Sequence, residues 1–127
     1  MRRAAVLALP LLLACGQPGG VVTQLPSGHS FRILRAGQVR FEKTGGTAAM
    51  LVYETPRRPD DAQGQEKDAL ELWDYFRPQV ERTSQRTAII QANTPDRALF
   101  FKGQAVAGFV WKRGDDGTWV RGKADGA

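Results

Sequence analysis

The sequence predicts an α+β fold, in which a single antiparallel sheet of about six or seven strands packs on one main helix, in the order βββ-α-ββββ. Short apolar runs separated by turn residues predict the strands. Because most of these runs are joined by short turns, we expect antiparallel pairing. One stretch with apolar residues at helical spacing predicts the helix. The chain has 127 residues, 42% of them hydrophobic, which suffices for one domain but not for two.

The first residues have the organisation of an export signal. Two basic residues, Arg2 and Arg3, precede an apolar run over residues 4–14. This run is too short to span a bilayer, which needs about 20 apolar residues, but it has the length of a signal-peptide core. The run ends in Leu12-Leu13-Ala14-Cys15. This tetrapeptide resembles the lipobox of bacterial lipoproteins.

The lipobox resemblance implies a location and an anchor. Residues 1–14 would be a signal peptide, and Cys15 would be lipidated on its sulfur and become the mature N-terminus. The protein would then be held in the cell envelope by its lipid. The outer membrane is favoured over the inner membrane, because Gly16 is not the aspartate associated with inner-membrane retention. Two alternatives stay open: a secretory signal with an unrelated cysteine, and a cytosolic protein with an apolar N-terminus.

Charge and residue counts exclude several classes of function. The formal charge of +5 falls to +3 once Arg2 and Arg3 are removed, and the remaining arginines are scattered along the chain. We therefore expect no nucleic-acid binding, but a surface that suits anionic lipid headgroups or polysaccharide. One cysteine and one histidine exclude an intrachain disulfide, a Cys-rich zinc site and a multi-His metal centre. We predict no metal and no cofactor.

Pro and Gly residues predict the first part of the mature chain to be a tether. Residues 15–29 are expected to be the lipidated cysteine and a flexible linker, followed by one α+β domain over 30–122 and a disordered tail over 123–127. Residues 30–43 alternate apolar and polar and are predicted to form a hairpin. A three-residue loop at 36–38 is expected, because that register puts Phe31, Ile33, Val39 and Phe41 on one face.

The middle of the chain predicts a central strand and then the helix. A turn at 44–47 precedes a nearly continuous apolar run over 48–55, which suits a strand covered on both faces. The helix is expected over about residues 63–83, with Asp60-Asp61 capping its start. Its apolar face would be Ala69, Trp73, Phe76 and Val80, and its polar side Asp68, Glu71, Asp74 and Arg77. Pro78 is expected to kink or split this helix.

Four β-rich runs follow the helix. We expect strands over 87–92, 97–102, 104–112 and 118–121, with a hairpin turn at 113–117. The mature domain resembles small uncharacterised exported α+β proteins, in which a helix bearing Trp and Phe lies between an apolar strand and a later strand pair. That resemblance implies a fold and no function.

No motif in the sequence predicts catalysis. His29 follows a Gly- and Pro-rich stretch and has Ser27 nearby, but a triad needs a histidine that a carboxylate holds rigid. We therefore predict a solvated loop histidine. Asp115-Asp116 lacks the ligand spacing of a calcium loop and fits a hairpin turn instead.

Four residues are predicted to form an interaction surface. Trp111 and Trp119 could grip a sugar or a partner strand if they lie on an outer sheet face, whereas core packing is the commoner fate of such residues. The register of the hairpin over 104–121 decides between these alternatives. Arg57 and Arg58 lie in the connection at 56–65, which could serve as a protruding loop.

Together these features predict a non-enzymatic binding or adaptor module displayed on a membrane surface. Its partner would be an envelope protein or a polysaccharide. Two alternatives stay open. One is a small cell-envelope hydrolase that uses acidic residues. The other is an inhibitor or immunity-type protein that uses the 56–65 loop.

Overall fold

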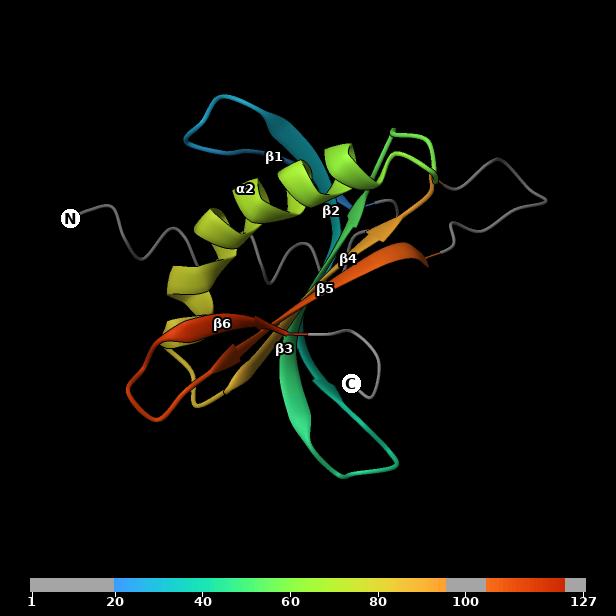
Figure 1. Cartoon of the computed structure of the whole chain (residues 1–127). Helices are drawn as coiled ribbons and strands as arrows, with labels where there is room; N and C mark the ends of the chain where they lie inside the picture. Colours follow the sequence, from blue (N-terminus) through green and yellow to red (C-terminus); the bar gives the residue numbers. More distant parts are fainter. Residues whose placement is uncertain (1–19, 96–104, 123–127) are drawn as a thin grey trace.

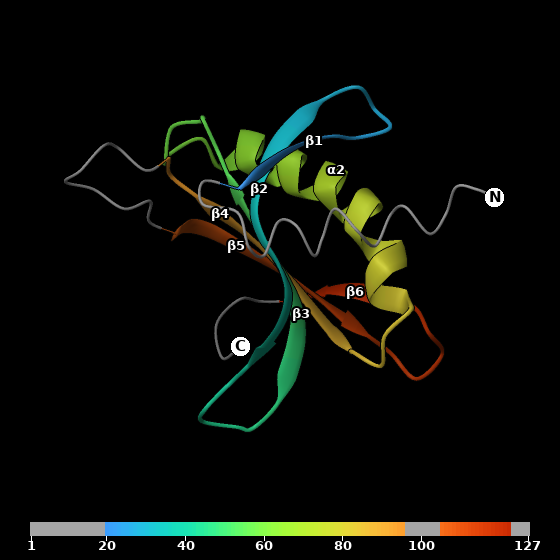
Figure 2. The ribbon, with the colours of Figure 1, turned by 180° about the vertical axis from the view of Figure 1, so that it is seen from behind.

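A computed structural model describes residues 20–95 and 105–122 (Figure 1). They form one six-stranded sheet in the order β1-β2-β3-β4-β5-β6 and one helix, α2, which lies across one face of it (Figures 1 and 2). The strands are β1 Val21–Gln24, β2 Ser30–Arg40, β3 Thr47–Glu54, β4 Thr87–Asn93, β5 Ala105–Arg113 and β6 Trp119–Gly122, and α2 spans Ala62–Glu81. The predicted α+β class, with one sheet and one main helix, is confirmed.

The sheet is mixed, so the prediction of a purely antiparallel sheet is wrong. β3 and β4 pair parallel, with Ala49 opposite Ala88 and Glu54 opposite Asn93, whereas every other neighbouring pair is antiparallel. The reason is the helix between them. A helix carries the chain back to the end at which the first strand began, and the next strand then runs in the same direction.

The predicted hairpin over 30–43 is also wrong. β2 is one continuous strand, and residues 36–38, expected as a loop, pair with Leu51, Met50 and Ala49 of β3. A bulge between Ile33 and Arg35 shifts the register. Phe31 and Ile33 therefore face the helix, while Val39 and Phe41 pack on the opposite side of the sheet. Alternation with a period of two fits a long bulged strand as well as a hairpin, so the pattern alone could not separate them.

The chain joins the sheet earlier than expected. Val21–Gln24, placed in the tether by the sequence, forms β1 and pairs antiparallel with β2. Gly20, just before it, has a φ of +78°, and a Cβ at this position would lie 2.4 Å from the carbonyl oxygen of Ile33. Only glycine fits such a close approach to the neighbouring strand.

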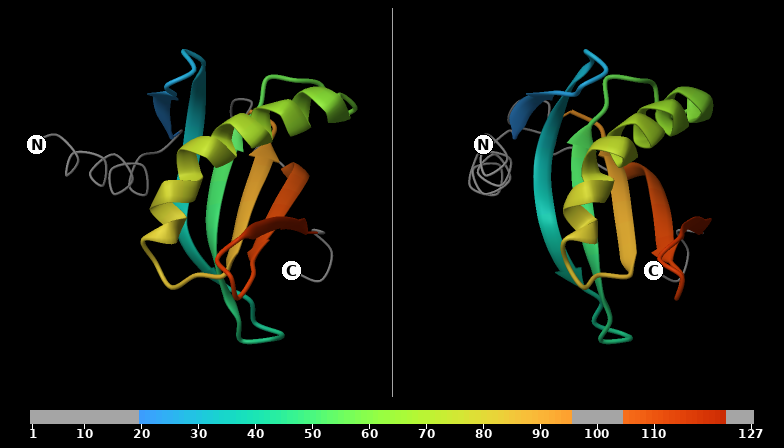
Figure 3. Two further views of the ribbon diagram at one scale, coloured as in Figure 1. Left: turned by 60° about the vertical axis from the view of Figure 1, so that its left-hand side comes forward. Right: turned by 90° about the vertical axis from the view of Figure 1, so that its left-hand side faces the viewer.

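The helix matches its predicted position closely. Asp61 caps it by accepting a hydrogen bond from the backbone N–H of Gly64 at 3.0 Å. It continues through Pro78 without being split, and its axis bends toward its C-terminal end (Figure 3). The predicted apolar face is buried together with Leu72. It packs on Tyr53, Ile90, Phe109 and Trp111 to form the main core.

The other predictions fall into two groups. The turn at 44–47, the central strand, the strands at 87–92, 104–112 and 118–121 and the turn at 113–117 are confirmed within small shifts of boundary. The signal peptide, the lipobox, the strand at 97–102 and the tail at 123–127 lie outside the described residues. In the described ranges, α2 is too polar to be a membrane-spanning helix.

Candidate functional site

A groove opens where the start of β2, the connection after β3 and the first half of α2 meet. Its volume is about 660 Å³. Three apolar residues form one part of the lining: Val22, Phe31 and Pro56. Polar or charged residues form the rest of the lining: His29, Ser30, Arg32, Glu54, Arg57, Lys67, Asp68 and Glu71. The β1–β2 hairpin and the N-terminal half of α2 flank this region (Figures 1 and 3). We call it the hairpin–helix groove.

One side of the groove holds a cluster of Ser27, His29 and Glu71. Glu71, on α2, accepts a hydrogen bond from the Ser27 hydroxyl and lies 2.8 and 2.9 Å from Nδ1 of His29 through its two carboxylate oxygens. Burial acts to raise the pKa of Glu71, but the hydrogen bonds from Ser27 and His29, with the nearby charges of His29 and Lys67, lower it on balance. This carboxylate is therefore held ionised.

The cluster has the residue types of a catalytic triad but not its connectivity. In a triad the histidine lies between the nucleophile and the carboxylate and accepts the proton of the hydroxyl. Here the carboxylate of Glu71 lies between Ser27 and His29, so the serine proton points to Glu71. The His29 side chain is 68% exposed. Because Nδ1 bonds Glu71, the other ring nitrogen, Nε2, is available to a ligand or to water.

The second polar contact in the groove is a two-pronged ion pair. Nε and Nη2 of Arg57 donate to the two carboxylate oxygens of Asp68 at 2.6 and 3.1 Å, and Nη1 reaches Asp61 at 3.4 Å. The hydrogen bond and charge of Asp68 raise the pKa of Arg57. Asp68 is buried, which corrects its predicted place on the polar side of the helix. The ion pair fastens the β3–α2 connection to the helix.

A buried hydroxyl lies behind this ion pair. Tyr53 of β3 is fully buried, packs edge-on against Phe31 with ring centroids 5.8 Å apart, and its hydroxyl has no hydrogen-bond partner among the described residues. Burial raises the pKa of Tyr53, the charge of Asp68 raises it further, and Arg57 opposes both. A buried hydroxyl without a hydrogen-bond partner lowers the free energy of unfolding by about 1–3 kcal/mol. The Tyr53 hydroxyl is such a group, and it lies near the Arg57–Asp68 pair.

Lys67 completes the set of groups that a ligand could meet. It is exposed on α2, one helical turn before Glu71, and its ammonium group makes no hydrogen bond or ion pair with another residue that the structure describes. The groove thus presents Lys67 and Nε2 of His29 beside an apolar wall. Groups of this kind bind an anionic or hydrogen-bonding side chain.

The predicted surface residues do not form one surface. Trp111 is 4% exposed and stacks on Trp73 with ring centroids 4.5 Å apart. Trp119 is half-buried, meets Trp73 edge-on at 5.1 Å and donates from its indole nitrogen to Glu81 at 3.0 Å. Arg113 pairs with Trp119 and Trp111 pairs with Arg121, so both tryptophans lie on the same face of the sheet. Their contacts with Trp73 show that this face carries α2. Core packing is the correct alternative for Trp111.

The predicted basic residues of the connection lie near the groove. Arg57 lines it, and Arg58, whose side chain is 83% exposed, pairs with Asp60 at 3.2 Å. The acidic turn has a structural explanation, as predicted: Asp116 accepts from the backbone of Thr118 at 3.0 Å, which lowers the pKa of Asp116, and Asp115 pairs with Arg86.

Sequence reasoning missed the groove because its parts are far apart in the chain. His29 and Glu71 are 42 residues apart, and nothing local links them. Within 20–95 and 105–122, no group of three or more His, Cys, Asp or Glu residues is placed to hold a metal ion.

Comparisons with protein-family models, with curated proteins and with solved structures find no match to this chain.

Proposed function

We propose that this protein is a bacterial envelope lipoprotein, anchored through Cys15, and that its domain is a non-enzymatic module that binds a segment of another envelope protein in the hairpin–helix groove. The lipobox residues support the anchor. The pairing of an apolar wall with the exposed Lys67 ammonium and with Nε2 of His29, whose ring Glu71 holds through Nδ1, is the observation that carries the binding role. The partner segment would carry an acidic side chain next to an apolar one, since these match the two parts of the groove.

The mixed lining favours a protein segment over a polysaccharide. Sugar-binding sites commonly present an exposed aromatic ring on which a sugar can stack. Among the described residues that line this groove, Phe31 is the single Phe, Tyr or Trp, and it is 9% exposed and is engaged edge-on by Tyr53. Apolar side chains beside charged ones are instead typical of protein–protein contacts, where a desolvated centre is surrounded by a polar rim.

The anchor is tested by the mass of the mature N-terminus. Protein purified from the membrane fraction of the producing bacterium should begin at Cys15 and carry acyl chains, and the Cys15→Ser variant should lack them. A membrane-fraction protein that still begins at Met1, or that carries no acyl chain, would contradict the lipoprotein assignment.

The groove is tested by site-specific photocrosslinking in living cells. A photoreactive residue at Ser30, which lines the groove, should give one defined crosslinked product, and the same residue at Lys112, an exposed lysine of β5, should not. In the protein with a crosslinker at Ser30, Lys67→Glu should reduce the product severalfold, whereas Lys112→Glu should leave it unchanged. Products that are equal at both positions would argue against the groove. A product that yields to glycan-degrading enzymes would show that the partner is a polysaccharide.

A hydrolase is a second candidate, because Glu71 orients His29 as a carboxylate orients a general base. In this reading Nε2 of His29 would take a proton from water, and Glu71 would hold the ring. Hydrolysis of cell-wall material that is lost in His29→Gln, but not in Ser27→Ala, would favour this candidate.

The inhibitor alternative is supported by the rigidity of the 56–65 connection. Its backbone is held by a bond from Asp61 N–H to the carbonyl of Arg58 at 3.0 Å, and by Gln65 Nε2, which donates to the same carbonyl at 2.9 Å. Arg58 projects from this frame. Loss of inhibition of a secreted enzyme in Arg58→Ala, with Lys67→Glu unaffected, would favour this candidate over binding in the groove.

A further inference from the structure

The described chain enters the sheet beside the middle of β2. Gly20 lies against the backbone of Ile33 and Leu34, and β1 then runs away from this point until Gln24 pairs with Ser30. The second half of β2, from Arg35 onward, extends past the start of β1. No strand in the described ranges pairs with this part of β2 on the side away from β3.

The proposed lipid anchor sets how far this entry point can lie from a membrane. Residues 16–20 separate Cys15 from the start of β1. Five residues span at most about 18 Å when fully extended, because each residue contributes about 3.3–3.6 Å. If Cys15 is held at the bilayer, the part of β2 next to Gly20 must lie close to the lipid headgroups. The expected long tether would have placed no such limit.

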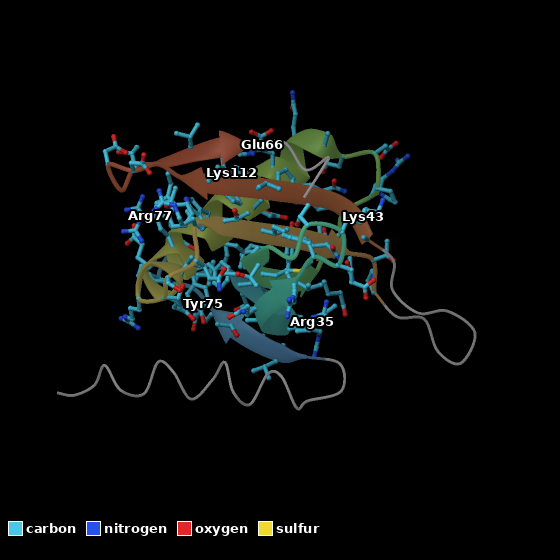
Figure 4. The ribbon with its side chains drawn as sticks, turned by 90° about the horizontal axis from the view of Figure 1, so that it is seen from below. Arg35, Lys43, Glu66, Tyr75, Arg77 and Lys112 are labelled. Atoms are coloured by element: carbon cyan, nitrogen blue, oxygen red, sulfur yellow. The ribbon has the colours of Figure 1, made fainter. Side chains whose placement is uncertain are left out.

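Three cations lie along this part of the molecule. Arg35 and Arg40 of β2 and Lys43 of the following turn are exposed, and no hydrogen bond or ion pair joins their side chains to another described residue. We call these three residues the basic edge. Its charges lie at the rim of the sheet, because Arg35 shares the sheet face of Val39, whereas Arg40 lies on the face that carries α2. The acidic side chain of Glu42 lies among them. In Figure 4, Arg35 and Lys43 lie on one side of the view, and Tyr75 and Arg77, from α2, lie on the other.

Most other arginines are engaged within the protein. The described ion pairs join Arg57 to Asp68, Arg58 to Asp60, Arg77 to Glu81, Arg86 to Asp115 and Arg121 to Glu66. Three of the cations without an ion pair thus follow one another along a single edge of the sheet, which begins beside the entry point at Arg35. Lys67 and Lys112, which also make no ion pair with another described residue, lie on other parts of the surface. Exposed acidic residues such as Glu66 and Asp74 belong to α2, on the face of the sheet that carries the helix.

An apolar side chain, which also lines the hairpin–helix groove, lies where the groove meets this edge. Val22 of β1 is 57% exposed and pairs across the strands with Arg32. Its position, one residue pair from the entry point, places it at the same side of the sheet as Arg35. Exposed apolar residues next to cations are typical of surfaces that lie at a membrane interface.

From the short connection and the charge distribution together, we infer that the basic edge docks on an anionic phospholipid surface and so fixes the orientation of the domain on its membrane. This inference depends on the proposed lipid anchor. Each cation close to an anionic membrane strengthens binding by about fivefold, and the attraction fades within a Debye length of about 8–10 Å. α2 would face away from the lipid, because its exposed carboxylates are repelled by it.

The test uses the mature acylated protein reconstituted into vesicles that contain anionic phosphatidylglycerol. Since acylation consumes Cys15, a cysteine introduced at Gln38 is the single free thiol and can carry a fluorophore. A matched probe at Asp74 reports on α2. Quenching by a headgroup-attached quencher should be several-fold stronger at position 38 than at position 74. It should fall toward the value at position 74 in neutral vesicles, in high salt, and in the R35E/R40E/K43E variant, with circular dichroism confirming that the variant is folded.

Each contrary result has a separate meaning. Equal quenching at both positions, or quenching that the charge reversals leave unchanged, would overturn the docking of the basic edge while leaving the anchor intact. Self-quenching between probes at position 38 would show instead that a second copy of the chain covers this edge. Protein without acyl chains on Cys15 would overturn the proposed anchor, and the inference with it.

Discussion

Nδ1 of His29 lies 2.8 Å from Oε2 of Glu71, and this contact ties the beginning of β2 to the middle of α2. It is one of few polar links between the β1–β2 hairpin and the helix in the described chain. Ser27 adds a hydroxyl to the same carboxylate. One glutamate thus holds both ends of the β1–β2 turn against the helix, and it shapes one side of the hairpin–helix groove.

Glu71→Gln should lower the free energy of unfolding at pH 7 by about 1 kcal/mol, because the partners of Glu71 are partly solvated. The pKa of Glu71 is lower in the folded protein than its ordinary value of 4.5. Its contribution is therefore present above pH 4.5 and is lost as the pH falls through the lower folded-state pKa. Urea unfolding at pH 7 and at pH 3 measures the difference. The parent and the Glu71→Gln variant should differ less in free energy of unfolding at pH 3 than at pH 7. An equal difference at both pH values would contradict the ionised role of Glu71.

Asp68→Asn should destabilise the protein by clearly more than the loss of an exposed pair, because the buried Asp68 carboxylate accepts both prongs of the Arg57 guanidinium, which would keep only its 3.4 Å contact with Asp61. Asp60→Asn is the matched control, since it removes the partner of Arg58 from a pair in which both side chains are mostly exposed. We expect a change within about 0.5 kcal/mol there. Thermal or urea unfolding of the two variants compares them directly. Similar losses in both would show that the Arg57–Asp68 pair behaves as an ordinary surface pair.

Trp73 and Trp111 should be energetically coupled. Their rings are stacked at 4.5 Å with planes 10° apart, so replacing either by leucine removes the same ring contact. A double-mutant cycle with Trp73→Leu and Trp111→Leu should give a coupling energy of about 0.5–1.5 kcal/mol. The cycle of Trp111→Leu with Val22→Thr, a distant exposed position, serves as the control and should be additive. Additivity in the tryptophan cycle would show that stacking adds nothing beyond burial.

The sequence could predict what depends on local periodicity. The apolar face of α2 repeats at helical spacing, and the Asp61 cap precedes it directly, so both could be read without knowledge of the rest of the fold. The central strand could be predicted equally well, because a continuous apolar run is typical of a strand that is buried on both faces.

What escaped prediction depends on long-range register. The β2 bulge moves Val39 to the face opposite Phe31. No residue of that strand is one whose type signals a bulge in the sequence. The parallel pairing of β3 with β4 follows from how α2 crosses the sheet. The contact between His29 and Glu71 exists only once both β1–β2 and α2 are in place, so a histidine that looked solvated proved to have a partner.

Gly20→Ala should detach β1 from the sheet. A Cβ at this position would lie 2.4 Å from the carbonyl oxygen of Ile33, and the residue has a φ of +78°, which disfavours alanine. The backbone of β2 cannot yield without breaking its pairing with β3, so we expect a loss of about 1–3 kcal/mol and faster amide hydrogen exchange over Val21–Gln24. Gly37→Ala is the control: nothing lies within 4 Å of its Cβ position, and alanine suits a strand better than glycine. That variant should be as stable as the parent or slightly more so. Unchanged stability and unchanged exchange in Gly20→Ala would show that the backbone of Gly20 does not lie against Ile33. The inference that only a short connection separates the domain from its proposed anchor would then fail as well.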